Sequence, residues 1–166
     1  MNEARLALLK QYFESLSVQS VDRLGDIYSR DAYFKDPFND VRGVSEIQRV
    51  YTHMFAKLQS PRFLVQRSWL DGDSAVLWWE FAFRFRGGKP EGEQRISGTS
   101  VLQFDADGKV NHHRDYWDPA EGLYEKFPVI GVLMRWLKRG AWAEFPRRLY
   151  ASAVPGEAHG YWLSEH

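Results

Sequence analysis

The sequence contains no cysteine, so it has no disulfide, no thiolate metal site and no cysteine nucleophile. It has no excess charge of either sign, because 22 Lys and Arg residues balance 22 Asp and Glu residues. Nucleic-acid binding needs a clear basic excess, so nucleic acid is not expected as the main partner. Long hydrophobic runs are also missing, since no stretch approaches the roughly 18 continuous apolar residues of a membrane span. The N-terminus does not read as a secretory signal, and we expect a soluble, cytoplasmic protein.

What the chain does have is a large apolar content for its length. Its 166 residues are 44% hydrophobic and 16% aromatic, which is enough for the core of a single domain. Helical spacing of apolar residues predicts a first helix over Glu3–Ser17. Ser20 is expected to cap a second helix that includes Tyr28, and Ala32–Asp36 is expected to form a short strand before a loop over Pro37–Gly43. Ser45 and Gln48 have the spacing of a capping box, which predicts a third helix from Ser45.

From Arg62 onward the pattern is typical of strands. Arg62–Leu70 and Ala75–Arg86 flank the turn signal Asp71-Gly72-Asp73, which predicts a hairpin. Gln94–Phe104 and Lys109–Asp118 flank a second Asp-Gly turn and predict another. Helices followed by a meander of strands indicate an α+β domain. Because the strands carry aromatics on both faces, we expect one face to pack on helices and the other on a partner subunit.

We divide the chain into an α+β domain over residues 1–118 and a helical extension over 119–166. A helix is expected over Glu121–Arg139, and the later residues remain rich in aromatics, so the extension should pack on the same domain. The apolar face of Val129–Leu137 is expected to cover a pocket mouth or the sheet. Contact of this basic helix with a membrane surface is the less favoured alternative.

Asp36 is the first candidate for chemistry. It ends a short apolar strand, directly precedes Pro37, and has aromatic residues on both sides in sequence. A carboxylate among apolar side chains is expected to be desolvated, and a desolvated carboxylate suits a general base. The alternative is that Asp36 only opens a turn, since Asp-Pro is a common turn initiator.

The last predicted strand carries a second candidate site. Strand alternation places His113, Asp115 and Trp117 on one face, and His112 on the other. A histidine beside a carboxylate forms a proton-handling pair, or else a buried hydrogen bond that fixes the strand. The face lacks a third metal ligand, so no metal is expected.

The helices, the strand ending in Asp-Pro and the meander resemble the nuclear transport factor 2-like superfamily, with its SnoaL-like and ketosteroid isomerase-like fold. The resemblance covers Leu6 to Asp118 and implies a cone-shaped, curved antiparallel sheet wrapped around the N-terminal helices. In ketosteroid isomerases, an aspartate in this context is the general base, which corresponds to Asp36. Their oxyanion-hole tyrosine lies 24 residues earlier, as Tyr12 does here, and two supporting tyrosines match Tyr28 and Tyr51. Their second acid corresponds to Ser100, a weaker hydrogen-bond donor.

The resemblance further implies a hydrophobic ligand pocket in a homodimer, without a cofactor. Its expected walls are Trp79, Phe81 and Phe83, with Trp117 opposite. His113 and Asp115 would be a proton relay or a substrate anchor. An epoxide-hydrolase mechanism is not expected, because the adjacent Arg114 and Asp115 face opposite ways.

We therefore predict a cofactor-independent proton-transfer enzyme of isomerase, cyclase or dehydratase type, acting on a small hydrophobic carbonyl compound. The predicted catalytic residues are Asp36, Tyr12, His113, Asp115 and Ser100. The alternative is a non-catalytic ligand-binding or protein-interaction module.

Overall fold

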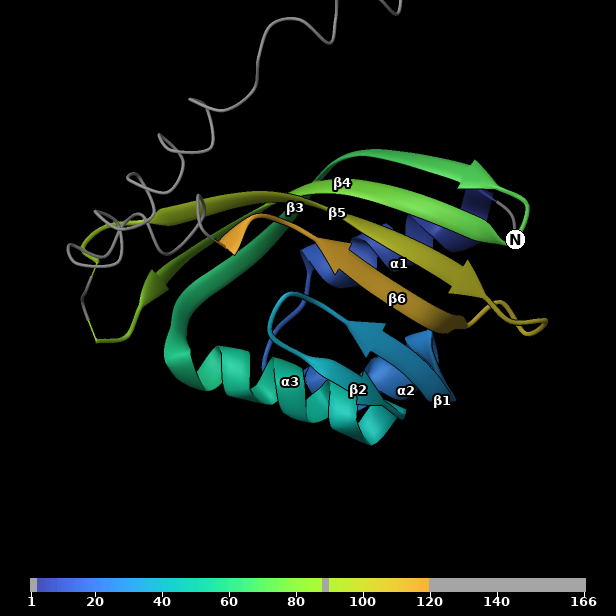
Figure 1. Ribbon diagram of the computed structural model, residues 1–166, viewed down its shortest axis with the longest axis horizontal. Helices are drawn as coiled ribbons and strands as arrows, with labels where there is room; N and C mark the ends of the chain where they lie inside the picture. The colour runs from blue at the N-terminus through green and yellow to red at the C-terminus, as the bar shows by residue number, and fades with distance from the viewer. Residues whose placement is uncertain (1–2, 88–89, 120–166) are drawn as a thin grey trace, which may run out of the picture.

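The computed structural model describes residues 3–87 and 90–119 (Figure 1). The helical elements are α1 (Glu3–Glu14), the 3-10 turn η1 (Val21–Arg23), α2 (Leu24–Ile27) and α3 (Val44–Lys57). The strands are β1 (Tyr28–Lys35), β2 (Asp40–Arg42), β3 (Leu58–Asp71), β4 (Ser74–Phe85), β5 (Gln94–Phe104) and β6 (Val110–Tyr116). They form one sheet in the order β2-β1-β6-β5-β4-β3, so the predicted α+β class is confirmed.

Both predicted hairpins are present. β3 pairs with β4 around Gly72, and β5 leads into β6 through a turn that includes Gly108. Both glycines have positive φ, 56° and 72°, which side chains rarely tolerate. β5 has the predicted bounds, whereas β3 begins earlier than predicted, directly after α3.

The sheet is mixed, which corrects the expectation of an antiparallel sheet. β1 pairs parallel to β6, although the other strand pairs are antiparallel. After β1 and β2, the chain crosses through α3 to the far edge of the sheet. The meander then returns strand by strand, so its last strand lies beside β1.

Local predictions around the short helices were partly wrong. Tyr28 begins β1 instead of continuing a helix, and the Ser20 side chain makes no capping hydrogen bond to η1. α3 is preceded by Gly43 at φ 96° with no side-chain cap, so the Ser45 capping box does not form. Gln48 instead donates to the carbonyl oxygens of Val21 and Asp22, which ties α3 to the preceding turn.

The core lies between the concave face of the sheet and the helices. Figure 1 shows the long strands β3, β4 and β5 curving over α1, with α3 crossing below. Glu14 at the end of α1 accepts a hydrogen bond from the backbone of Val65, where the β3–β4 register shifts. The most deeply buried large side chains come from all parts of the domain: Tyr28, Phe34, Leu24, Ile47, Leu77, Leu102 and Val110.

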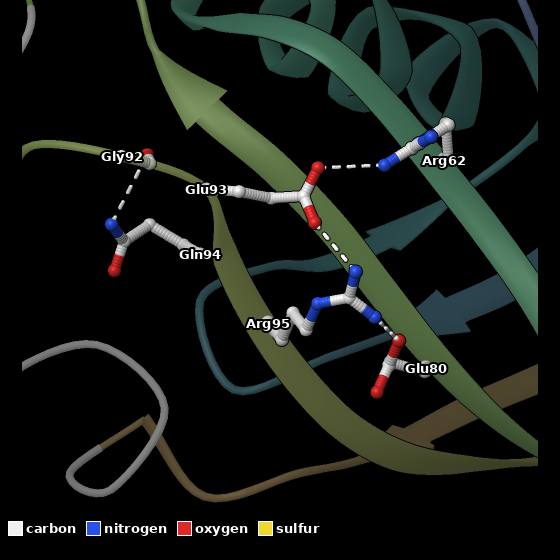
Figure 2. A network of polar contacts seen from close by, with 6 residues as sticks. All are labelled: Arg62, Glu80, Gly92, Glu93, Gln94 and Arg95. Carbon is white, nitrogen blue, oxygen red and sulfur yellow. Dashed lines mark hydrogen bonds and ion pairs between the residues drawn. The ribbon is translucent and has the colours of Figure 1, made fainter.

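The outer face of the sheet is mixed in character. Leu64, Trp69, Trp78 and Tyr116 are exposed apolar side chains from β3, β4 and β6. Figure 2 shows a chain of ion pairs in which Glu93 bridges Arg62 and Arg95, and Arg95 also pairs with Glu80.

None of the helices in the described ranges has the length and apolar character of a membrane span. The helix expected over Glu121–Arg139, including Val129–Leu137, lies outside the described residues.

Candidate functional site

A cavity of about 340 Å³ lies between α3 and the concave face of the sheet. That volume is within the usual range for small-molecule sites. Its wall is mainly aromatic and aliphatic and includes the predicted Trp79, Phe81, Phe83, Trp117 and Tyr51. Its polar lining residues are Asp36, Asn39, Tyr51, His53, Lys57 and Asp115.

Asp115 anchors the inner end of this cavity. Its Oδ1 accepts hydrogen bonds from the hydroxyl of Ser100 at 2.5 Å and from Nε2 of His113 at 2.8 Å. Its Oδ2 accepts no hydrogen bond from any residue that the structure describes. The side chain is only 16% exposed, and its carboxylate is held through one of its two oxygens.

Tyr28 fixes the orientation of His113 from behind the cavity. The phenol oxygen of Tyr28 lies 2.5 Å from Nδ1 of His113, and their rings are stacked. Burial raises the pKa of Tyr28 well above its ordinary value, so Tyr28 keeps its proton. Because the carboxylate of Asp115 only accepts hydrogen bonds, a neutral His113 carries its hydrogen on Nε2, and its Nδ1 accepts from Tyr28.

Tyr51 extends this chain back to the cavity. Its hydroxyl is hydrogen-bonded to Tyr28, and its ring lines the cavity wall. Burial, followed by the nearby charge of Asp115, raises the pKa of Tyr51, so its phenol also stays protonated. Asp115 and Tyr51 are thus the two ends of a buried hydrogen-bonded chain, and both reach the same cavity.

Ser100 and Trp79 support Asp115 from the other side. The indole Nε1 of Trp79 donates to the Ser100 hydroxyl at 2.8 Å, and that hydroxyl donates to Asp115. Gly98 makes room for the indole, since a Cβ there would lie 2.4 Å from a Trp79 ring carbon. Because the hydroxyl hydrogen of Ser100 is used within this network, Ser100 positions Asp115, which differs from the predicted donation to an oxyanion.

Asp36 also lines the cavity, but both of its oxygens are used by the turn that follows β1. Oδ1 accepts from the backbone N–H groups of Phe38 and Asn39 at 2.7 and 2.6 Å. The side-chain amide of Asn39 donates to Oδ1 at 3.0 Å and to Oδ2 at 2.9 Å. Asp36 therefore opens a turn, which was the alternative to a general base that its position before Pro37 suggested.

Tyr12 does not meet its predicted partners. Its hydroxyl donates to the backbone carbonyl of Ser20 at 2.6 Å, and Tyr12 is not among the residues that line the cavity. The next residue, Phe13, turns inward and contacts the ring of His113 edge-on. Tyr12 therefore has the expected distance of 24 residues to Asp36 in the sequence, but its side chain lies on a face of α1 that does not line the cavity.

Asn39, His53 and Lys57 also line the cavity, although none of them is among the residues predicted from the sequence. Val50, Met54 and Lys57 follow one another at helical spacing on α3, so the periodicity held a signal for Lys57. The described residues contain no cluster of metal-ligating side chains.

The comparisons with known proteins agree with this architecture. A steroid Δ-isomerase of Nocardioides simplex is 26% identical over 117 residues, covering 69% of this chain and 90% of its own length. A SnoaL-like polyketide cyclase of Shewanella denitrificans superimposes with a TM-score of 0.64 at 20% identity, covering 75% of this chain and 97% of its own. An epoxide hydrolase of the limonene type from Mycobacterium tuberculosis gives 0.59 at 14% identity, covering 81% and 90%. These two structural likenesses show the fold.

The family model of the SnoaL-like domain matches residues 9–113, which include α3, most of the meander and His113. That match extends over more than half of the chain. The protein therefore belongs to the SnoaL-like domain family of the nuclear transport factor 2-like superfamily.

Proposed function

We propose that this protein is a cofactor-independent proton-transfer enzyme of isomerase, cyclase or dehydratase type. Its substrate is a small hydrophobic carbonyl compound held in the aromatic cavity. The observation that carries the proposal is Asp115, whose Oδ1 is fixed by Ser100 and His113 while Oδ2 has no partner among the described residues. A positioned carboxylate with a free oxygen in a largely apolar cavity suits a general base.

The proposed first step removes a proton from the carbon next to the substrate carbonyl. That proton passes to Oδ2 of Asp115, and the electrons of the broken C–H bond move onto the carbonyl oxygen as an enolate. Tyr51 keeps its proton and lines the cavity wall, so it is the proposed donor to the enolate oxygen, toward which its O–H turns from the oxygen of Tyr28 as the charge develops. If the enolate is reprotonated at another carbon, the reaction is an isomerisation. If the enolate carbon attacks a second carbonyl of the substrate, it is a cyclisation. If the enolate expels hydroxide, it is a dehydration.

Of the two cavity carboxylates, we assign the base to Asp115 in preference to Asp36. Asp36 keeps four hydrogen bonds within its own turn, and acting as a base would weaken some of them. His113 then acts as a positioning residue for Asp115, which differs from the predicted role as a proton relay or substrate anchor. The similarity to a steroid isomerase and the fold shared with a polyketide cyclase support this reaction class.

The test begins by identifying a ligand that is retained through purification, using mass spectrometry. Exchange of its α-protons in D₂O is then followed by NMR with the native protein and with Asp115→Asn. We expect the native protein to accelerate exchange and Asp115→Asn to lose most of that acceleration. Equal acceleration by both proteins would remove Asp115 as the base.

A non-catalytic ligand-binding module is the second candidate. The predominantly apolar lining of the cavity favours it, because such a surface binds hydrophobic ligands without chemistry. Tight binding of the retained ligand, with no α-proton exchange above the solvent rate, would favour this candidate.

We further propose that the outer face of the sheet joins two copies of the chain. The exposed side chains of Trp69 and Trp78 lie on this face. Trp78→Glu should convert a dimer to a monomer in light scattering, whereas Leu8→Glu, at an exposed residue of α1, should not. A native protein that is monomeric at all concentrations contradicts this proposal.

A further inference from the structure

The mouth of the cavity carries two side chains whose partners are missing within the described residues. Lys57 and His53 both line the cavity and lie four residues apart, on neighbouring turns of α3. Neither the ammonium group of Lys57 nor the imidazole of His53 makes a hydrogen bond or ion pair with a described residue. Both side chains are exposed, in contrast to the buried Tyr51 on the same helix.

The usual role of a lysine at the end of a helix is already taken by another residue. Basic side chains near a helix C-terminus commonly bond the last free carbonyl groups. Here the side chain of Arg86 donates to the carbonyl of Phe55 at 3.3 Å, and its backbone N–H donates to the carbonyl of Lys57 at 3.1 Å. The ammonium group of Lys57 is therefore not needed to complete the end of α3.

The cavity thus has chemically different ends along α3. Tyr51 is linked to Asp115 through Tyr28 and His113. It lies six residues before Lys57, which corresponds to about 9 Å along a helix axis. Met54 lies between them on α3, and most of the other lining side chains are apolar, Phe83 and Ile96 among them. A ligand that reaches both ends is a hydrophobic molecule with a carbonyl near Asp115 and a negatively charged group near Lys57.

We infer that the substrate class is a hydrophobic carbonyl compound that carries a carboxylate at the end opposite its reacting carbon, and that Lys57, assisted by His53, selects this carboxylate. The inference rests on the proposed function for the position of the reacting carbon. An ion pair at the partly exposed mouth gives modest discrimination, and we expect a charged ligand to bind about two- to fivefold more tightly than its neutral counterpart. The preference should fall as salt concentration rises.

The test compares 2-naphthylacetate with 2-naphthylacetamide, which share a shape and differ in charge. Binding is followed by quenching of tryptophan fluorescence, since Trp79 and Trp117 line the cavity. In the full-length protein the carboxylate should bind more tightly than the amide. Lys57→Met should abolish that preference, and Lys57→Glu should reverse it. Lys10→Met, at a lysine of α1 that does not line the cavity, should leave the preference unchanged.

Equal affinity of the native protein for the two probes overturns the inference, and so does a preference that survives in Lys57→Met. In either case, binding of the amide with normal α-proton exchange of the natural ligand leaves the proposed function intact. Failure of the native protein to bind both probes contradicts the inference and the hydrophobic pocket of the proposed function together. The binding measurement requires no turnover, so a catalytically inactive protein still gives a result.

Discussion

The turn after β1 and the end of β6 each bring one carboxylate to the same cavity, but they use it differently. Asp36 is held by groups within three residues of itself along the chain, namely Phe38 and Asn39. Asp115 is held by side chains from two strands, and His113 is in turn held by Tyr28 from a third. Both carboxylate oxygens of Asp36 are bonded within its turn. Only one oxygen of Asp115 is bonded to the residues that the structure describes.

This difference shows why a local sequence context is a poor guide to whether a carboxylate still has an oxygen that no neighbour bonds. The Asp-Pro pair and its aromatic neighbours made Asp36 the more conspicuous candidate in sequence. Whether a carboxylate is available for chemistry depends on which donors it already satisfies, and for Asp115 those donors are distant in the chain. The converging network around Asp115 is more typical of a site that is preorganised for one function.

The comparison is tested most directly by replacing each carboxylate in turn. Asp115→Asn should lower turnover of the identified substrate by about 10² to 10⁴, because a positioned general base contributes that much. Asp36→Asn should keep most of its turnover but lose about 1 to 2 kcal/mol of unfolding free energy, since the amide accepts fewer of the turn's hydrogen bonds. Steady-state kinetics and urea denaturation of both variants measure the two effects. The reverse pattern would restore Asp36 as the base.

The two candidate phenols extend the comparison. Tyr51→Phe should lower turnover by about 10² to 10³, the typical cost of removing one donor to an oxyanion. Tyr12→Phe should leave turnover nearly unchanged, because its hydroxyl is bonded to the backbone of Ser20. The same kinetic assay measures both variants, and melting temperatures check that each is folded. A larger loss of turnover in Tyr12→Phe than in Tyr51→Phe would indicate that Tyr12, and not Tyr51, is the donor to the enolate oxygen.

Gly98 tests whether the Asp115 region depends on close packing. In Gly98→Ala, the new Cβ would clash with the Trp79 indole, which must move away from Ser100. We expect a loss of about 1 to 3 kcal/mol in unfolding free energy, the usual cost of overpacking, together with reduced turnover. Urea denaturation measures the first effect. Gly87→Ala is a matched control, because a Cβ at Gly87 meets nothing within 4 Å. Equal stability of both variants would mean that the indole position is not tightly constrained.

The sequence predicted the elements whose signals are local. Asp-Gly turns marked both hairpins, and strand alternation correctly placed His113 and Asp115 on one face, where they are in contact. The parallel pairing of β1 with β6 was missed, because it depends on where the chain returns after a long crossover. The same pairing brings Tyr28 to His113, so the support of the site was also beyond local reasoning.

Errors at the helices have a different cause. Ser45 has the spacing of a capping box, but the backbone before α3 turns through Gly43, and Gln48 finds carbonyl partners in the preceding turn. Tyr12 has the spacing of the oxyanion donor, but a shift of one residue on a helix turns a side chain by about 100°. Phe13 occupies the inward position instead, in line with the buried Leu6 and Leu9, so the apolar spacing of α1 indicated the inward residue better than the distance to Asp36 did.

The smallest expected effect concerns His112, which connects the two regions because it pairs with Tyr33 of β1 just before the Asp36 turn. Burial, together with the nearby positive charges of Arg114 and Arg42, lowers the pKa of His112 from its ordinary value of 6.5. As pH falls below about 6.5, the unfolded chain takes up this proton before the folded protein does, so unfolding free energy decreases. In His112→Gln, which does not titrate, stability should fall less steeply than in the native protein between about pH 7 and 5.5. Urea denaturation across that range measures both slopes, with His53→Gln as the control for an exposed histidine. If stability falls equally steeply with pH in the native protein and in His112→Gln, the junction of β1 and β6 tolerates a charge on His112. The two carboxylate regions would then be joined less rigidly than the pairing of these strands indicates.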